Sequence, residues 1–209
     1  MKKVIATLFA LILLAATPAM SFNWSGVVAR LAKSTVQLQT PLQEGFCSGW
    51  VSDNRPTRDF VFTAEHCVNS DWVKDGEIFI DNLPASVIWS DTNMDVAVLQ
   101  VGGIDRPELR PGKHPRVGQE MGSYGFAYGF KSPLFRAGHV SAVDYHIPDL
   151  PGDWVITDQT FIGGMSGGPV VNGDGKVIAM VQRGNTYIGL GHSIKEIYSA
   201  TKQFWRYRP

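Results

Sequence analysis

A single serine lies among four glycines in the stretch 163–169, which reads Gly-Gly-Met-Ser-Gly-Gly-Pro and leads into an apolar, strand-like segment. Glycine tolerates positive φ and close approach of other atoms, so the backbone can turn tightly around Ser166. The N–H groups of Gly164 and Ser166 can then converge on one point, where an oxyanion would be stabilised. The pattern favours Ser166 as a nucleophile, although a glycine-rich turn between two strands has the same appearance. Other residues must decide between these interpretations.

Two upstream residues have the types that a nucleophilic serine requires, namely a base and a carboxylate that orients the base. His66 follows the apolar segment 60–62, and Asp95 opens the apolar strand 95–99. An unpaired carboxylate in such a strand would be costly, so Asp95 is expected to have a partner. We therefore predict His66 as the base and Asp95 as its partner. The remaining histidines are interpreted as structural or surface groups, and they are His114, His139, His146 and His192.

The elements that would position these residues are mainly short strands. Apolar runs of strand length are separated by turn signals rich in Asp, Asn, Gly and Pro, a rhythm typical of an all-β sandwich or barrel. The stretch 102–115 is rich in glycine, proline and charge and divides the chain near its middle. Strand-like segments resume after it. Ser25 is expected to cap a short N-terminal helix, and the capping-box pattern at Ser193 predicts a C-terminal helix.

Composition indicates a globular, exported chain with balanced charge. Of its 209 residues, 44% are apolar and only 18% are charged, which excludes intrinsic disorder. The 19 basic and 19 acidic residues cancel, so the charge balance favours neither nucleic acid nor an acidic membrane as a partner. Two lysines, an apolar run and small residues occupy 1–20, the three parts of a secretory signal, and predict a secreted or periplasmic protein. Cleavage after Ala19 or Ser21 fits equally well, and an uncleaved segment would act as a membrane anchor.

Three segments carry a resemblance to the chymotrypsin-like (trypsin superfamily) serine proteases: 63–67 (Thr-Ala-Glu-His-Cys), 95–99 (Asp-Val-Ala-Val-Leu) and 164–169 (Gly-Met-Ser-Gly-Gly-Pro). Their order of His, Asp and Ser separates this family from subtilisins and α/β-hydrolases, which use other orders. The resemblance covers nearly all of the chain after the signal. The compact spacing and the segment 157–166 look most like the bacterial HtrA-type branch, but too few residues follow Ser166 for the PDZ domains that this branch usually carries.

The resemblance implies an all-β fold of two packed antiparallel β-barrels, with a short N-terminal helix and a C-terminal helix. One barrel would hold His66 and Asp95 and the other Ser166, with the active site in the cleft between them. The expected boundaries are a signal peptide at 1–20 and a protease domain at 21–209, with the N-terminal barrel at about 34–104, the C-terminal barrel at about 117–192 and the C-terminal helix at about 193–205.

The family's mechanism implies a role for each of these residues. Ser166 would be the nucleophile, His66 the general base and then the acid, and Asp95 the group that orients His66. The N–H groups of Gly164 and Ser166 would form the oxyanion hole. The implied function is that of a serine endopeptidase, which hydrolyses polypeptide substrates through an acyl-enzyme and needs no cofactor. Two alternatives remain open: a non-catalytic binding module that keeps the protease fold, and a hydrolase of non-peptide esters.

Cys47 and Cys67 are the only cysteines, and the segment 46–50 resembles the family segment whose cysteine bridges the one after the catalytic histidine. The resemblance therefore implies a disulfide between Cys47 and Cys67, which an exported protein permits. Two free thiols or a metal-binding pair are the alternatives. No further ligands at zinc-like spacing support a metal site, so none is predicted.

In this family the position six residues before the nucleophile forms the base of the main specificity pocket, and here that residue is Thr160. Trypsin-like members place an aspartate there, so cleavage after Arg or Lys is not expected. Asp158 would reach the pocket only if the loop differed from the family's. Phe161 would add apolar surface, while Gly184 and Gly191 resemble small residues of the pocket wall. A small or medium aliphatic side chain is therefore expected to fit best.

Two residues depart from the family's pattern. Glu65 replaces the small residue that usually precedes the histidine, and the sequence offers no physical account of it. Gln182 occupies the strand position that in the family helps to orient the aspartate. These departures limit how far the family's geometry carries over.

Overall fold

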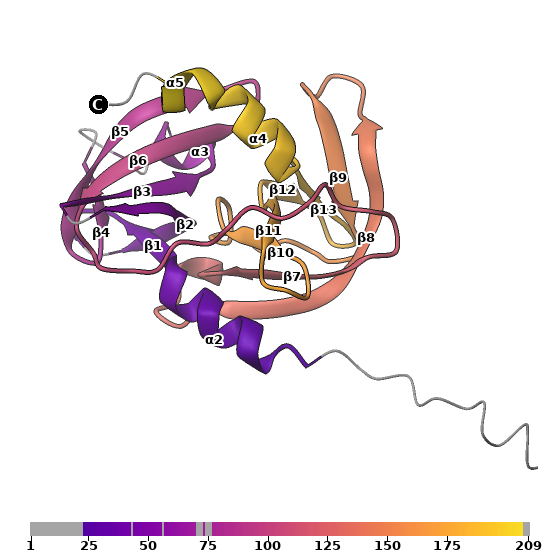
Figure 1. The fold of residues 1–209 in the computed structure, drawn as a ribbon, viewed down its shortest axis with the longest axis horizontal. Coiled ribbons are helices and arrows are strands. Elements are labelled where there is room, and N and C mark those ends of the chain that lie inside the picture. Colours follow the sequence, from indigo (N-terminus) through magenta and orange to yellow (C-terminus); the bar gives the residue numbers. More distant parts are fainter. Residues whose placement is uncertain (1–22, 43, 56, 70–72, 74–76, 207–209) are drawn as a thin grey trace, which may run out of the picture.

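The computed structural model describes residues 23–42, 44–55, 57–69, 73 and 77–206, and its strands form two lobes that follow each other along the chain (Figure 1). The predicted signal at 1–20 lies outside the described residues. The strands of the N-terminal lobe are β1 (Thr35–Gln39), β2 (Gly45–Arg55), β3 (Arg58–Thr63), β4 (Ile78–Ile80), β5 (Leu83–Asp91) and β6 (Val96–Gly102). They close into a barrel in the order β1-β2-β3-β6-β5-β4.

Aromatic and β-branched side chains, which favour strands, fill the interior of this barrel. Trp50, Phe60 and Phe62 are almost fully buried, and the rings of Trp50 and Phe62 lie 5.4 Å apart. Register shifts in β2 and β5 bend these strands around the core. Because a closed barrel has no free edge, every strand is held on both sides. The lobe is therefore a firm support for the turns at its ends.

The C-terminal lobe is a half-barrel built from a seven-stranded sheet. Its strands are β7 (Glu120–Gly125), β8 (Leu134–His146), β9 (Asp153–Thr157), β10 (Pro169–Val171), β11 (Val177–Met180), β12 (Arg183–Gly184) and β13 (Gly189–Gly191). They run in the order β11-β10-β7-β8-β9-β13-β12, so β11 and β12 lie at the two ends of the sheet. The predicted all-β fold is confirmed; of the two predicted barrels, the first is closed and the second is a half-barrel.

The helices near the two ends of the described chain each cross to the opposite lobe. The first, α2 (Ser25–Ser34), precedes the barrel, but Trp24 at its N-cap packs on Phe135 of β8 with ring centroids 5.2 Å apart. The last two, α4 (Ile194–Ala200) and α5 (Lys202–Arg206), lie over the N-terminal barrel (Figure 1). There Tyr198 packs on Phe62 at a centroid distance of 5.6 Å. The contacts of these helices with the opposite lobe hold the two lobes together.

The predicted N-terminal helix forms, and the single helix predicted at about 193–205 is divided into α4 and α5 at Thr201. Only the C-terminal region has the predicted cap. The Ser193 side chain accepts from Glu196 N, and the Glu196 carboxylate accepts from Ser193 N, which completes the expected capping box. The predicted cap at Ser25 is wrong. Trp24 occupies the N-cap position of α2 and makes no side-chain cap, while Ser25 is already the first helical residue and donates its N–H to Asn23 Oδ1.

The stretch predicted to connect the lobes is bound to both of them. Leu109 is buried, and its N–H donates to Val51 O in the first lobe at 2.9 Å. The Gly112 N–H donates to Val177 O in the second lobe at 2.6 Å. These bonds fix the path of the connection and help to set how the lobes pack.

Candidate active site

His66 and Asp95 come from neighbouring turns at one end of the barrel. His66 lies in the short helix α3 (Glu65–Val68), which follows β3, and Asp95 lies between β5 and β6. Asp95 Oδ2 and Oδ1 lie 2.9 and 3.0 Å from His66 Nδ1, and Oδ1 also accepts the His66 main-chain N–H at 2.9 Å. The Asp95 side chain is 6% exposed and that of His66 44%. The pairing therefore occupies Nδ1 and leaves Nε2 for another partner.

Asp95 has a left-handed backbone conformation, with a φ of 50°, which is uncommon for a residue other than glycine. Gln182 from the second lobe holds this turn, because its Nε2 donates to Met94 O at 2.7 Å and to Asp95 O at 2.9 Å. Its Oε1 accepts from His192 N at 2.6 Å, which fixes the orientation of the amide. Gln182 thus contacts the main chain of the Asp95 turn rather than its carboxylate.

The buried carboxylate of Glu65 connects the His66 helix to the Asp95 turn. Glu65 Oε1 accepts hydrogen bonds from Asn69 Nδ2 at 3.1 Å and from Thr92 Oγ1 at 3.2 Å. Thr92 O in turn accepts the Asp95 N–H at 3.4 Å. Glu65 is therefore a positioning residue for the pair. The sequence offered no account of it because Thr92 lies 27 residues away along the chain.

Ser166 lies in a turn that requires glycine on both sides. Gly164 and Gly167 have φ of 91° and 82°, a region that L side chains rarely adopt. A Cβ on Gly167 would also collide with Ser48 O and Thr63 Oγ1 of the first lobe. The glycines thus allow the Ser166 turn to pack directly on β2 and β3, which precede the helix that carries His66.

Ser48 is a site residue that the sequence analysis missed. Its N–H donates to Ser166 O at 2.8 Å, and its hydroxyl donates to Gly164 O at 2.8 Å. The same hydroxyl accepts the Phe126 N–H at 2.8 Å. Ser48 is fully buried and comes from β2, so the first lobe holds the Ser166 turn of the second. The one available signal was its position directly after Cys47.

The main-chain amides of Gly164 and Ser166 have no acceptor among the residues that the structure describes. The carbonyl of Gly163 accepts the Tyr128 N–H at 2.7 Å, and because the peptide is planar and trans, the Gly164 N–H points the opposite way. Neither amide is therefore occupied by an acceptor from the described part of the chain. The Ser166 hydroxyl makes no hydrogen bond within the described chain, and catalytic hydrogen bonds often tighten only with substrate.

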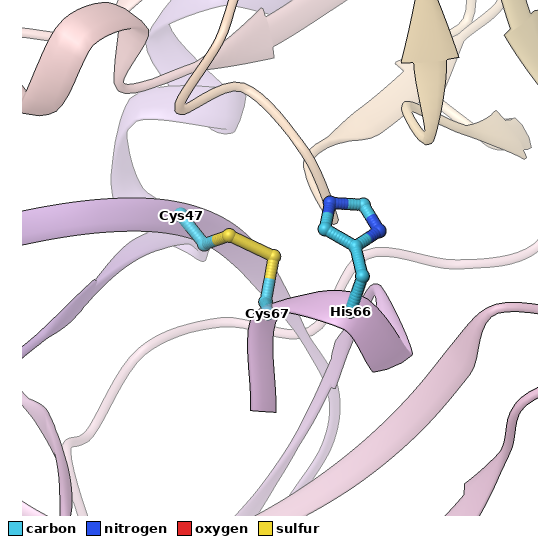
Figure 2. A group of neighbouring side chains, drawn as sticks. All are labelled: Cys47, His66 and Cys67. Carbon is cyan, nitrogen blue, oxygen red and sulfur yellow. A yellow bond between two sulfur atoms is a disulfide. The ribbon is translucent and has the colours of Figure 1, made fainter. Parts of the chain in front are cut away.

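A disulfide lies directly beside His66. Cys47 on β2 is bonded to Cys67 in α3, with 6.1 Å between their Cα atoms. Figure 2 shows the Cys67 and His66 side chains leaving α3 on the same side. The two sulfur atoms and one His66 ring nitrogen lie within 4.8 Å of one another. The bond between the two sulfur atoms ties α3 to β2. Because cysteine binds metals as a thiolate, the two bonded sulfur atoms are not metal ligands.

A hollow of about 450 Å³ lies beside Ser166. Its lining consists mainly of apolar side chains and glycines, and the lining residues are Phe161, Ile162, Gly163, Ser166, Val181, Gln182, Arg183 and Gly184. Phe161 and Gly184 were predicted as pocket residues and lie at this hollow. The predicted pocket residues Thr160 and Gly191 lie outside its lining.

Thr160 and Gly191 are engaged elsewhere. The Thr160 hydroxyl donates to Thr186 O at 2.8 Å, and the Cα of Gly191 lies against the main chain of β11, where a Cβ would collide. Asp158 is also turned away from the hollow. Its Oδ1 accepts the His139 N–H at 2.7 Å, and its Oδ2 lies 3.0 Å from His139 Nδ1. Of the residues that the structure describes, none that lines the hollow is acidic.

His192 is a structural histidine behind the site. It is fully buried and packs on Trp154 with ring centroids 4.3 Å apart, and its Nδ1 lies 3.0 Å from Asp153 O. Burial lowers the pKa of His192 below its ordinary value, which favours the neutral ring. The main-chain N–H of His192 also holds the side-chain amide of Gln182 in place.

Known proteins that resemble this chain are described as serine endoproteases. A family described as "Trypsin-like peptidase domain" matches residues 47–180. The chain is 34% identical over 119 residues to "Probable periplasmic serine endoprotease DegP-like" from Halomonas elongata. It is 34% identical over 123 residues to a protein of the same description from Chlamydia pneumoniae. Each match covers 54% of this chain and 25% of the relative, so the chain matches about a quarter of the length of these relatives.

Several solved structures share the fold at low sequence identity. A serine endoprotease from Yersinia pestis has a TM-score of 0.73 at 19% identity, covering 90% of this chain and 68% of that one. An inactive form of Rv3671c from M. tuberculosis H37Rv has a TM-score of 0.70 at 19% identity, covering 93% and 97%. The HtrA-type protease AlgW, solved with a decapeptide, has a TM-score of 0.73 at 17% identity, covering 88% and 68%. These likenesses concern the fold alone.

Proposed function

Because the chain belongs to the trypsin-like peptidase domain family, we propose that it is a serine endopeptidase with Ser166 as nucleophile, His66 as general base and Asp95 as orienting carboxylate. The observation that carries the proposal is the contact of Asp95 with both the ring and the main chain of His66. A buried carboxylate bonded in this way sets the tautomer and the orientation of the imidazole. His66 Nε2 then accepts the proton of the Ser166 hydroxyl.

In the proposed reaction, His66 takes the proton of the Ser166 hydroxyl while Oγ attacks the scissile carbonyl carbon. The carbonyl oxygen becomes an oxyanion, which the N–H groups of Gly164 and Ser166 stabilise. His66 then gives its proton to the leaving amine, and the C–N bond breaks to leave an acyl-enzyme. Water attacks the ester carbonyl with His66 again accepting a proton. Return of that proton to Oγ releases the carboxyl product and restores Ser166.

We propose that polypeptides are cleaved after a small or medium aliphatic residue. Phe161, Ile162 and Val181 give the hollow beside Ser166 an apolar lining. A lysine or arginine side chain there would lose its hydration without an acidic partner, at a large cost in free energy. AlgW, which shares the fold, was solved with a decapeptide, and this supports a polypeptide as the substrate proposed here.

We further propose that the protein is exported. The curated relatives are described as periplasmic, and the segment 1–20 has the composition of a secretory signal. A disulfide between Cys47 and Cys67 persists in an oxidising compartment. Among the residues that the structure describes, no helix is both long and apolar enough to cross a membrane.

Labelling with a fluorophosphonate, followed by mapping of the adduct by mass spectrometry, tests the proposal. We expect one adduct, on Ser166. Ser166→Ala should remain folded in thermal unfolding but lose the label and more than about 10³-fold in kcat/KM on peptides. Ser141→Ala, which changes an exposed serine on β8, is the matched control and should retain both. Turnover of Ser166→Ala within tenfold of wild type would exclude Ser166 as the nucleophile.

The same experiment separates the two alternatives. A binding module without catalysis would bind peptides but take no label. A hydrolase of non-peptide esters would take the label on Ser166 and cleave small activated esters, yet leave peptides intact.

A further inference from the structure

Arg183 lies on a strand that is tied to the nucleophile turn. Val181 O accepts the Gly167 N–H at 2.7 Å, and the Val181 N–H donates to Gly168 O at 2.9 Å. These glycines directly follow Ser166. Arg183 comes two residues after Val181, about 7 Å further along an extended chain. It opens β12 and is one of the residues that line the hollow beside Ser166.

Among the described residues that line this hollow, Arg183 is the only charged one. It is exposed, and within the described part of the chain no carboxylate lies at ion-pair distance from its guanidinium. Asp95 and Asp158 do not compensate it, because they are bonded to His66 and His139. The positive charge of Arg183 therefore stands at the edge of the candidate active site without a partner.

The strand that carries Arg183 also has a free edge. β12 is the last strand in the order of the sheet, and its described pairing is with β13. An extended peptide can add to such an edge through main-chain hydrogen bonds. Gln182 directly precedes β12, and its side chain faces the Asp95 turn. Because side chains alternate along extended chain, the Arg183 side chain is expected on the opposite face. A peptide paired with β12 would pass this side chain.

We propose that Arg183 selects substrates with an aspartate or glutamate at the second, third or fourth residue before the cleaved bond. This inference rests on the proposed endopeptidase function and names its substrate class. A guanidinium binds a carboxylate through two parallel hydrogen bonds. The acidic residue is not the one whose side chain enters the hollow, because Arg183 stands at the edge on β12 and the apolar side chains of Phe161, Ile162 and Val181 would not compensate a carboxylate buried among them.

The expected size of the effect follows from the exposure of Arg183. An exposed ion pair contributes little free energy. We therefore expect kcat/KM to be about three- to fivefold higher for a peptide with the acidic residue than for the same peptide with a neutral one. Salt screens such a pair, so the gain decreases as ionic strength rises. Reversing the charge at Arg183 should reverse the preference.

Quenched fluorescent peptides with valine before the cleaved bond test the inference. Glu, Gln or Lys is placed at each of the three preceding positions in turn, and at the second position after the bond as an internal control. The proteins are wild type, Arg183→Gln, Arg183→Glu and Lys176→Glu. Lys176 is exposed and lines a different hollow, so its reversal controls for net charge. Fluorophosphonate titration sets the concentration of active enzyme for each protein.

Wild type should cleave the Glu peptide about three- to fivefold faster than the Gln peptide at one or more of the preceding positions, and at low salt more than at high salt. Arg183→Gln should lose this preference, Arg183→Glu should prefer Lys, and Lys176→Glu should behave as wild type. Equal rates for Glu and Gln in labelled wild type, or an unchanged preference in Arg183→Gln, would overturn this inference alone. Wild type that takes no label and cleaves no peptide would overturn the proposed function and the inference with it.

Discussion

The two lobes contribute different things to the site because one is closed and the other is open. The N-terminal barrel has no free edge and carries His66 and Asp95 in turns at its end. The C-terminal sheet ends at β12, beside Ser166. A closed barrel holds each strand on both sides, whereas an open sheet leaves main-chain groups for an added strand. The closed lobe therefore suits the proposed role of His66 as a base held in place, and the open lobe suits the proposed binding of an extended peptide.

Each lobe also places one polar side chain in the functional turn of the other. Ser48 of the closed lobe donates its hydroxyl to Gly164 O, and Gln182 of the open lobe donates to Asp95 O. Both residues are buried, so these hydrogen bonds are shielded from water. The lobes thus position each other, and the arrangement of the site depends on how they pack.

The largest expected effect lies in the closed lobe. Asp95→Asn should lower kcat by about 10⁴-fold, because an amide favours the wrong tautomer of His66. Folding should be kept, since the Asn oxygen can still accept the His66 main-chain N–H. Steady-state kinetics on peptides, with thermal unfolding in parallel, measures both. Asp81→Asn, which weakens a surface ion pair with Arg106, is the control and should be nearly neutral. A mild effect of Asp95→Asn would mean that another carboxylate serves His66.

The next largest effect is expected from the disulfide beside His66, which lies in the closed lobe. Replacing Cys47 and Cys67 together by alanine should lower the free energy of unfolding by about 3 kcal/mol, because the bridge closes a loop of 20 residues. Denaturant unfolding measures this loss, and activity should fall as a secondary effect. Adding a reductant should destabilise wild type but leave the double variant unchanged. Two free thiols in fully active exported protein would show that the bridge is not part of the working enzyme.

A smaller effect is expected at Glu65, which links the two turns of the closed lobe. Glu65→Ala leaves Thr92 Oγ1 and Asn69 Nδ2 without this acceptor, and we expect kcat to fall about tenfold with little change in KM. Glu65→Gln is the matched variant and should restore most of the activity, because its amide oxygen can accept the same bonds. An equal loss in both variants would mean that the charge of Glu65 matters rather than its hydrogen bonds.

The smallest effect is expected at His192 in the open lobe and concerns pH. Burial lowers the folded pKa of His192 below its ordinary value of 6.5, despite the opposing effects of the Asp153 carbonyl, Glu196 and Asp95, while Arg183 lowers it further. Between the two pKa values the unfolded chain binds more protons than the folded one. The stability from neutral His192 is therefore fully present above about pH 6.5 and is lost as the pH falls through the folded pKa.

Thermal unfolding at several pH values between about 7.5 and 5 tests this dependence. The melting temperature of wild type should decrease over this range more steeply than that of His192→Phe. His146→Phe changes an exposed histidine and should follow wild type. Parallel curves for wild type and His192→Phe would show that His192 does not titrate as its burial implies.

Local motifs made the fold class and the family predictable from the sequence. The glycines lie within three residues of Ser166, and each predicted strand is a short run of neighbouring residues. The family was indicated by the order of His66, Asp95 and Ser166 along the chain. The capping box at Ser193 is equally local and was confirmed. The catalytic roles of the three residues stay a prediction, which the labelling experiment addresses.

Long-range contacts were not predictable in the same way. The partner of Ser48 lies 116 residues away along the chain, and that of Gln182 lies 87 residues away, so no spacing in the sequence relates them. The family pattern predicted Thr160 and Gly191 as residues of a specificity pocket. In the structure the two residues lie outside the lining of the hollow beside Ser166, and the Thr160 hydroxyl is bonded to Thr186 O, 26 residues away.

The sequence by itself thus determined the kinds of chemistry that the chain can perform and the order in which its parts appear. The tertiary structure decided which groups meet, including the link from Glu65 to Thr92, the packing of Tyr198 on Phe62 and the position of Arg183 at the hollow beside Ser166. The physical reason is that a motif specifies backbone conformation over a few residues, while the distance between two motifs is set by the packing of the closed lobe against the open one.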